Sequence, residues 1–233
     1  MSEKTEQGFD VKETYNRFEQ WFNNNRKMVY IVLGSIAGVI ALFVGYTKFY
    51  QEPRTKKAYA EMRFAEYTFA KYISAPEKLD SLKLALNGDK VHKGFLQIIS
   101  SYSGTGASNL AHAYAGIIYM RDRKFKEATE QLEKFDGKDQ IVSPEITGLL
   151  GDAYSELNDF DKALDYYKKA AYANDNMFTS PVFLKRAGQL SEKLKKYDDA
   201  KKYYDEIKLK YQGTTEAQDI DKYIARVETE LGS

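Results

Sequence analysis

The sequence predicts an all-α protein: a single N-terminal transmembrane helix followed by an α-solenoid of stacked helix pairs with a C-terminal capping helix. Three observations lead to this prediction. A run of twenty uncharged residues, 28–47, lies near the start of the chain. After Pro53 the chain contains a self-similar pattern with periods of 35 and 37 residues, which is typical of helical repeat proteins. Only four prolines occur, and good helix formers dominate the composition.

We expect four regions. Residues 1–27 form a head with a short amphipathic helix, 28–47 a transmembrane helix, 48–90 connecting helices and a degenerate first repeat, and 91–233 the repeat array with its capping helix. In the head, Val11, Tyr15, Phe18 and Phe22 recur at helical spacing, and we expect their helix to end at the three asparagines 23–25. This helix either lies on a membrane or a partner, or is a marginal solvent-exposed helix, because its balanced charge leaves both possibilities open.

Residues 28–47 match a membrane in length. Twenty helical residues span about 30 Å, the thickness of the hydrocarbon core. A signal peptide is disfavoured, because its apolar part is usually shorter and no small-residue cleavage site follows. Orientation is left undecided by the flanking positive charges, which are Arg17, Arg26 and Lys27 on one side and Lys48, Arg54, Lys56 and Lys57 on the other.

A stripe of small residues follows one face of this helix. Its members are Gly34, Gly38, Ala41 and Gly45. Such a stripe lets another membrane helix approach closely, so we expect helix packing here, although glycine is also common in spanning helices without that role. Membrane lipid is therefore one expected partner.

The repeat pattern has four recurring positions. Glycine recurs at Gly116, Gly151 and Gly188, and alanine follows twelve residues later at Ala128, Ala163 and Ala200. An aromatic residue precedes each alanine by three positions, and a bulky apolar residue follows it by four. This set resembles the tetratricopeptide repeat, in which two antiparallel helices form each repeat. Glycine inside a helix costs about 0.5–1 kcal/mol, so we expect each glycine and alanine to lie where the two helices approach most closely.

The array departs from the family pattern, and the sequence also predicts the elements at its two ends. The usual tryptophan and closing proline are replaced, and Ser191 stands where tyrosine is expected, so we expect irregular curvature. Residues 91–102, with Val91, Phe95 and Ile98, are predicted as the back half of an earlier repeat, and 216–231 as the capping helix.

Chemistry-bearing motifs are scarce. The two histidines, His92 and His112, are too far apart in sequence for a helical ligand pair, and no phosphate loop is present. "SGTGAS", residues 103–108, follows a helix rather than a strand and is predicted as a turn. The near-zero net charge, from 35 basic and 34 acidic residues, argues against nucleic-acid binding. We expect no enzymatic activity, no cofactor and no metal.

A partner-binding groove is expected on the first helix of each repeat. The candidate residues are Leu110, Ala113, Ile117 and Met120 in the first repeat, Glu145, Gly148, Asp152 and Ser155 in the second, and Val182, Lys185, Gln189 and Glu192 in the third. The Lys and Asn pattern of a carboxylate clamp is missing. The groove suits an extended or helical segment of another protein, although any one position is equally well a tolerated surface residue.

The order of head, spanning helix, repeat array and lone capping helix resembles the YfgM-like proteins of bacterial envelopes. "YSGTGASNLAHAYAG", 102–116, and "GDAYSELNDFDKALDYYKKA", 151–170, look especially like members from Bacteroidota. The resemblance implies a single-pass protein of the bacterial inner membrane with a periplasmic C-terminal domain. It also implies an ancillary role at the SecYEG translocon, with a PpiD-like chaperone and exported polypeptides as partners. The alternative is a general scaffold for cell-envelope assembly, serving outer-membrane or cell-wall complexes.

Overall fold

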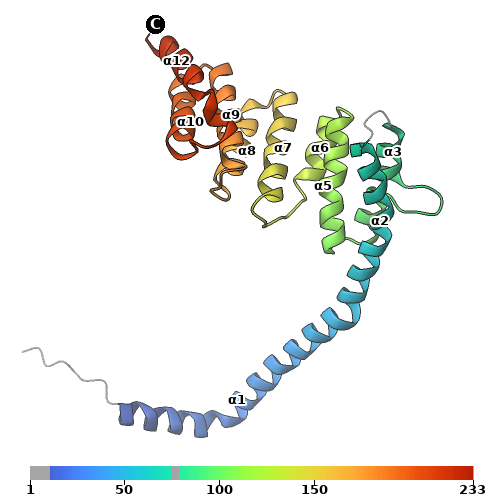
Figure 1. Cartoon of the computed structure of the whole chain (residues 1–233). Helices are drawn as coiled ribbons and strands as arrows, with labels where there is room; N and C mark the ends of the chain where they lie inside the picture. The colour runs from blue at the N-terminus through green and yellow to red at the C-terminus, as the bar shows by residue number, and fades with distance from the viewer. Residues whose placement is uncertain (1–10, 75–78, 233) are drawn as a thin grey trace, which may run out of the picture. The chain divides into compact units, whose positions relative to one another are not determined.

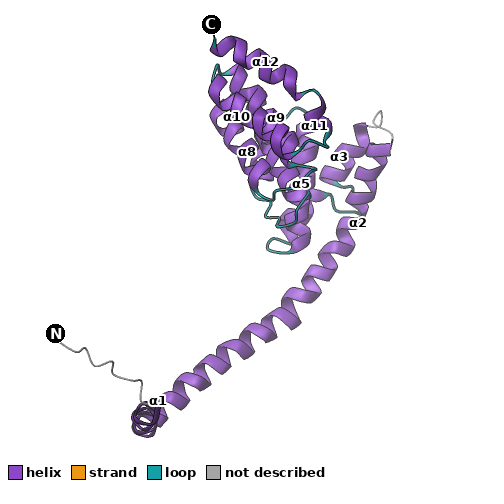
Figure 2. Cartoon of the chain, turned by 60° about the vertical axis from the view of Figure 1, so that its left-hand side comes forward, coloured by secondary structure: helices purple, strands orange, loops and turns teal. Residues whose placement is uncertain are grey.

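The protein is helical throughout the part that the structure describes. The computed structural model describes residues 11–74 and 79–232, where the β-structure is limited to one isolated bridge between Gly88 and Lys93 (Figure 2). The chain divides into two compact units, residues 1–53 and 54–233. We call them the N-terminal segment and the repeat domain, and describe each by itself. The all-α prediction is confirmed.

The N-terminal segment is one long helical stretch. Helix α1 (Val11–Tyr46) is followed by a π-helical turn, η1 (Thr47–Gln51), and by the first residues of α2 (Glu52–Ser74). The predicted break at residues 23–25 is wrong, because α1 runs through the three asparagines. The Asn25 side chain donates a hydrogen bond to the Trp21 carbonyl oxygen at 2.8 Å. Asparagine lowers helix propensity only modestly, and neither glycine nor proline stands there to end the helix.

This helix is apolar enough to cross a membrane or to act as a signal sequence. Its best 18-residue window has a mean hydropathy of 2.4, and none of that window is buried. Residues 1–10 of the predicted head lie outside the described residues.

The repeat domain is built from α2 and ten further helices among the described residues. They are α3 (Leu79–Asn87), α4 (Phe95–Ser101), α5 (Gly106–Arg121), α6 (Phe125–Leu132), α7 (Val142–Glu156), α8 (Phe160–Tyr172), α9 (Ser180–Lys193), α10 (Tyr197–Lys210), α11 (Thr215–Gln218) and α12 (Ile220–Leu231). Figure 1 shows α5 to α10 side by side in chain order, with α12 at the far end. The pairs α5/α6, α7/α8 and α9/α10 are repeats 1, 2 and 3. Of the predicted turn "SGTGAS", residues 103–105 form the turn, and 106–108 are the first residues of α5.

The beginning of the array differs from the prediction. Val91 is not in a helix: it lies in the loop before α4 and is 82% exposed. Gly88 has φ +73°, and a Cβ there would lie 2.3 Å from the carbonyl oxygen of His92. The chain thus folds back tightly between Gly88 and Gly94, and α4 begins only at Phe95.

The turn inside each repeat has a recurring left-handed residue. Arg123, Asn158 and Lys195 have φ values of 57°, 62° and 58°. Each stands seven residues after the repeat glycine. The next backbone N–H then donates to a carbonyl five residues earlier, as from Asp159 to Tyr154 at 2.9 Å. This closes the first helix and turns the chain into the second. The residue types differ, so the sequence pattern did not reveal this position.

Two apolar clusters fill the repeat domain. One joins α2, α3, α4 and one face of α5, and includes Met62, Phe95 and Ile98. The other runs from α5 to α12 and includes Phe183, Leu184 and Tyr204. Helix α5 contributes to both clusters, through Ala111 to the first and Ala113 to the second. Each repeat therefore completes its core only against its neighbours, as expected for a stacked array.

Candidate partner-binding groove

The repeat glycines lie where the two helices of each repeat are in close contact. A Cβ atom added at any of the three would come within 2.6 Å of a side chain on the second helix. The nearest atoms are Cδ2 of Leu132 for Gly116 (2.3 Å), Cδ1 of Tyr167 for Gly151 (2.6 Å) and Cε1 of Tyr204 for Gly188 (2.3 Å). The space that a larger residue would need is therefore occupied by the bulky residue four positions after each repeat alanine.

The repeat alanines are fully buried beside these contacts. Ala128, Ala163 and Ala200 each have 0% exposure. Only in repeat 2 is the alanine's backbone among the nearest atoms, since the carbonyl oxygen of Ala163 would lie 3.2 Å from a Cβ at Gly151. The glycine therefore makes room mainly for the bulky side chain of the second helix, and less for the backbone of the alanine.

A groove crosses the first helices α5, α7 and α9. Two cavities form it and share Asp152, Ser155 and Tyr167. One, of about 400 Å³, extends toward Met120 and Phe125. The other, of about 330 Å³, is completed by Arg186, Gln189, Leu190 and Lys193. We call the two together the first-helix groove.

The carboxylate of Asp152, at the centre of this groove, is hydrogen-bonded to other side chains of the array. Asp152 accepts a hydrogen bond from the Tyr167 hydroxyl at 2.8 Å and from Nη1 of Arg186 at 2.5 Å. Burial, together with the charge of Asp152, raises the pKa of Tyr167, so its hydroxyl remains a donor at neutral pH. A partner entering the groove therefore meets a neutralised carboxylate and does not have to desolvate an unpaired one.

Hydrogen-bonded ion pairs at a constant spacing link repeat 3 to repeat 2 and to the C-terminal helices. Arg186 pairs with Asp152, Arg226 with Glu192, and Lys185 with Asp219, and in each pair the residues are 34 positions apart. Glu192 also accepts a hydrogen bond from the Tyr204 hydroxyl at 2.5 Å. The sequence interpretation missed Arg186 and Arg226. Opposite charges one repeat period apart are the signal that points to them.

Only some of the predicted groove residues line the groove. Met120 and Gln189 line the groove, and so do Asp152 and Ser155. Leu110 and Ile117 are half-buried and pack against the two apolar clusters.

Three predicted positions are corrected. Ala113 is 3% exposed and belongs to the core, so it is not accessible to a partner. A Cβ at Gly148 would lie 1.8 Å from Cε1 of Phe183, which places this glycine in the contact between α7 and α9. Lys185 is held by Asp219 at 2.7 Å and lies over the Tyr223 ring, so it fastens the C-terminal helices to repeat 3.

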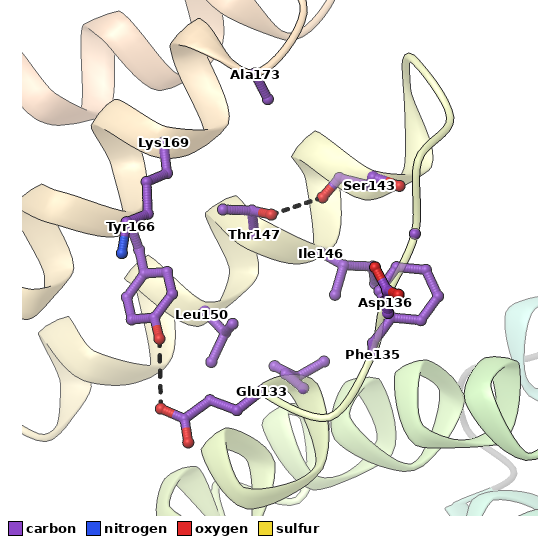
Figure 3. Close-up of a pocket in the computed structure, with 12 residues that line it drawn as sticks. Glu133, Phe135, Asp136, Ser143, Ile146, Thr147, Leu150, Tyr166, Lys169 and Ala173 are labelled. Atoms are coloured by element: carbon purple, nitrogen blue, oxygen red, sulfur yellow. Dashed lines mark hydrogen bonds between the residues drawn. The ribbon is translucent and has the colours of Figure 1, made fainter. Parts of the chain in front are cut away.

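A separate pocket lies between α6, α7 and α8 (Figure 3). Its volume is about 310 Å³, and it is closed on one side by the connection between α6 and α7. Leu132, Ile146 and Leu150 form its apolar floor. Glu133 on the rim accepts hydrogen bonds from the hydroxyls of Tyr154 and Tyr166.

The small-residue stripe of the N-terminal segment is open. Within the described residues, no atom comes within 4 Å of a Cβ added at Gly34, Gly38 or Gly45, and Ala41 is exposed. Residues 11–74 and 79–232 contain no group of three His, Asp or Glu side chains placed to hold a metal ion.

Comparison with known proteins agrees with this geometry. Residues 145–177, which cover most of α7 and all of α8, match the tetratricopeptide repeat family model. This match covers one repeat, and the fold of the chain is an all-α array of TPR-like helical repeats. Its fold is similar to a putative kinesin light chain from Podosopora anserina with nearly identical TPR-like repeats and to a point variant of that protein. For both, the TM-score is 0.55 and the identity 10%, over 76% of this chain and 88% of theirs.

The crystal structure of MamA is a further match, over 70% of this chain and 93% of that one, with 16% identity and a TM-score of 0.45. No curated protein matches the chain in sequence.

Proposed function

We propose that the protein is a membrane-anchored scaffold whose first-helix groove binds an extended or helical segment of a partner protein. One observation carries this proposal: the groove continues over the first helices of three successive repeats, from Met120 to Lys193. A groove of that extent suits a polypeptide segment better than a single small molecule. Tetratricopeptide arrays of this kind are typically non-enzymatic scaffolds.

We further propose that the protein works in the bacterial inner membrane, with the array in the periplasm. Its partners there would be the SecYEG translocon, a PpiD-like chaperone and exported polypeptides. This finer proposal is supported by the resemblance to YfgM-like proteins and by the apolar helix α1. The small-residue stripe, with Gly34, Gly38, Ala41 and Gly45, would contact a membrane helix of the translocon.

Affinity purification from solubilised membranes tests both levels of the proposal. Ser155→Trp fills the centre of the groove, whereas Lys202→Trp changes a side chain on α10 that is 76% exposed. We expect the wild type and Lys202→Trp to recover translocon subunits, and Ser155→Trp to lose the groove-bound partner. Outer-membrane or cell-wall proteins in place of translocon subunits would favour the general envelope scaffold. Equal recovery by all three proteins would contradict binding in the groove.

Protease protection in membrane vesicles tests the location of the array. We expect external protease to digest the repeat domain in right-side-out spheroplasts. In sealed inverted vesicles the repeat domain should be protected until detergent opens them. Digestion of the array from the cytoplasmic side of intact inverted vesicles would contradict a periplasmic array.

A further inference from the structure

The pocket between α6, α7 and α8 is distinct from the first-helix groove. None of the residues that line it lines the groove. It is formed by the long connection between α6 and α7, residues 133–141, which leads to the start of α7 at Val142. A Cβ at Gly137 would lie 2.2 Å from Oγ of Ser143 and 2.6 Å from Cζ of Phe135, so this connection is packed tightly against the start of α7. The wall of the pocket is therefore well defined.

The interior of the pocket is apolar and its shape is fixed by packing. Leu132 is 1% exposed, and Ile146 and Leu150 are each 5% exposed, so the floor belongs to the core. Tyr166 is held on one side by stacking on Tyr154, with ring centroids 5.4 Å apart and planes 5° from parallel. The volume of about 310 Å³ lies at the lower end of the range for small-ligand sites. It is sufficient for one aromatic or large aliphatic side chain.

The rim of the pocket is acidic. Glu133 and Asp136 line it, and the ion pairs formed by the described residues include neither carboxylate. Lys169 is the basic residue of the lining, and Asp165 neutralises it at 3.0 Å. Lys134 lines the neighbouring hollow around His112, which shares Asp136 with this pocket. The Tyr154 and Tyr166 hydroxyls orient Glu133 without neutralising it.

We infer that this pocket is a second binding site, which takes an apolar side chain next to a positive charge on a partner polypeptide. The ring or aliphatic chain rests on Leu132, Ile146 and Leu150, and the neighbouring ammonium or guanidinium lies between Glu133 and Asp136. An aromatic residue adjacent to Lys or Arg has this chemistry. The site is independent of the proposed groove, so the array engages a partner on the side of its second helices as well as on the side of its first helices.

Methyl NMR of the full chain in lipid nanodiscs tests this site with three probes of equal ring size. Phenethylammonium carries a positive charge, 2-phenylethanol is neutral, and 3-phenylpropionate is negative. We expect phenethylammonium to shift the methyl signals of Leu132, Ile146 and Leu150, and to bind at least fivefold more tightly than 3-phenylpropionate. Equal affinity of the three probes, or shifts centred on methyl groups elsewhere, would overturn the assignment.

Charge variants separate the acidic rim from the apolar floor. The double variant Glu133→Gln with Asp136→Asn keeps hydrogen-bond acceptors but removes both charges. It should weaken phenethylammonium at least fivefold and leave 2-phenylethanol unchanged. Glu130→Gln, a change on the exposed face of α6, is the matched control and should change neither. Ser155→Trp should also leave both probes unchanged, which distinguishes this pocket from the groove. Full retention of phenethylammonium affinity in the double variant would refute the role of the rim.

Discussion

Replacing Gly188 by alanine tests the close contact between the helices of repeat 3. The new Cβ would lie 2.3 Å from Cε1, 2.7 Å from Cζ and 2.9 Å from Cδ1 of Tyr204. Tyr204 is fully buried, and its hydroxyl is bound to Glu192 at 2.5 Å. The ring therefore cannot move away without leaving its hydrogen bond and disturbing the core.

The expected magnitude follows from three contributions. Alanine gains about 1 kcal/mol over glycine in helix propensity. Overpacking a core costs about 1–3 kcal/mol, and loss of the hydrogen bond to the charged Glu192 adds about 1.5–3 kcal/mol where the ring is displaced. We expect Gly188→Ala to lower the free energy of unfolding by about 2 kcal/mol, which corresponds to a fall in Tm of about 4–8 °C for a domain of this size.

Thermal unfolding of the full chain, followed by circular dichroism in nanodiscs, measures this effect. Gln189→Ala is the control, because Gln189 is exposed and its replacement should change stability by less than about 0.5 kcal/mol. In a Tyr204→Ala background the overlap is gone, so Gly188→Ala should become stabilising by up to about 1 kcal/mol. A Tm for Gly188→Ala equal to or above that of the wild type would refute the steric argument.

Three further predictions concern repeat 3 and its C-terminal contacts. Lys195→Gly should raise the free energy of unfolding by about 0.5–1 kcal/mol in denaturant titrations, because Lys195 has φ 58° and glycine adopts this conformation without strain. Asn158→Gly should raise it less, since asparagine tolerates a positive φ. A lower free energy of unfolding for Lys195→Gly would contradict this prediction. Ser191→Ala should be stabilising by about 1 kcal/mol, because the buried Ser191 hydroxyl has no hydrogen-bond partner in the described chain; a loss of stability would show that the hydroxyl is paired. The pKa of Asp219 is lowered to about 2 by hydrogen bonds from Lys185 and Lys222, so the stabilisation from Asp219 is complete above about pH 4, the pKa expected in the unfolded chain, and is lost as the pH falls toward 2. Asp219→Asn should therefore lower Tm at pH 7 and reduce the fall in Tm between pH 4 and 2, whereas an unchanged pH profile would contradict this role.

The repeat architecture could be predicted because its signal lies in residue size. Glycine, alanine and a bulky residue recur at fixed spacing, and each is required by a contact that depends on volume. The left-handed residues of the turns could not be predicted in this way, because Arg123, Asn158 and Lys195 share a backbone conformation but no side-chain chemistry. The beginning of α4 was not predicted correctly either, because Val91 has the apolar spacing of the helix but lies in the loop that follows the turn at Gly88.

The groove was predicted only in part, because helix spacing alone cannot tell an exposed position from one covered by the next repeat. Ala113 and Gly148 occupy groove spacing but are covered by neighbouring helices. Arg186 was missed because it contributes to the groove through its ion pair with Asp152, one repeat away. The pocket between α6 and α8 arises from the path of the connecting chain, which residue spacing on the helices does not describe.

Site-specific photo-crosslinking in native membranes measures directly whether the first-helix groove binds a partner polypeptide. A photoreactive amino acid at Gln189 lies in the groove, and the same group at Lys202 lies on exposed α10. We expect a discrete crosslinked polypeptide from position 189, abolished by Ser155→Trp, and none of the same size from position 202. An identical product from both positions, or a product at 189 that survives Ser155→Trp, would contradict the groove as the binding surface.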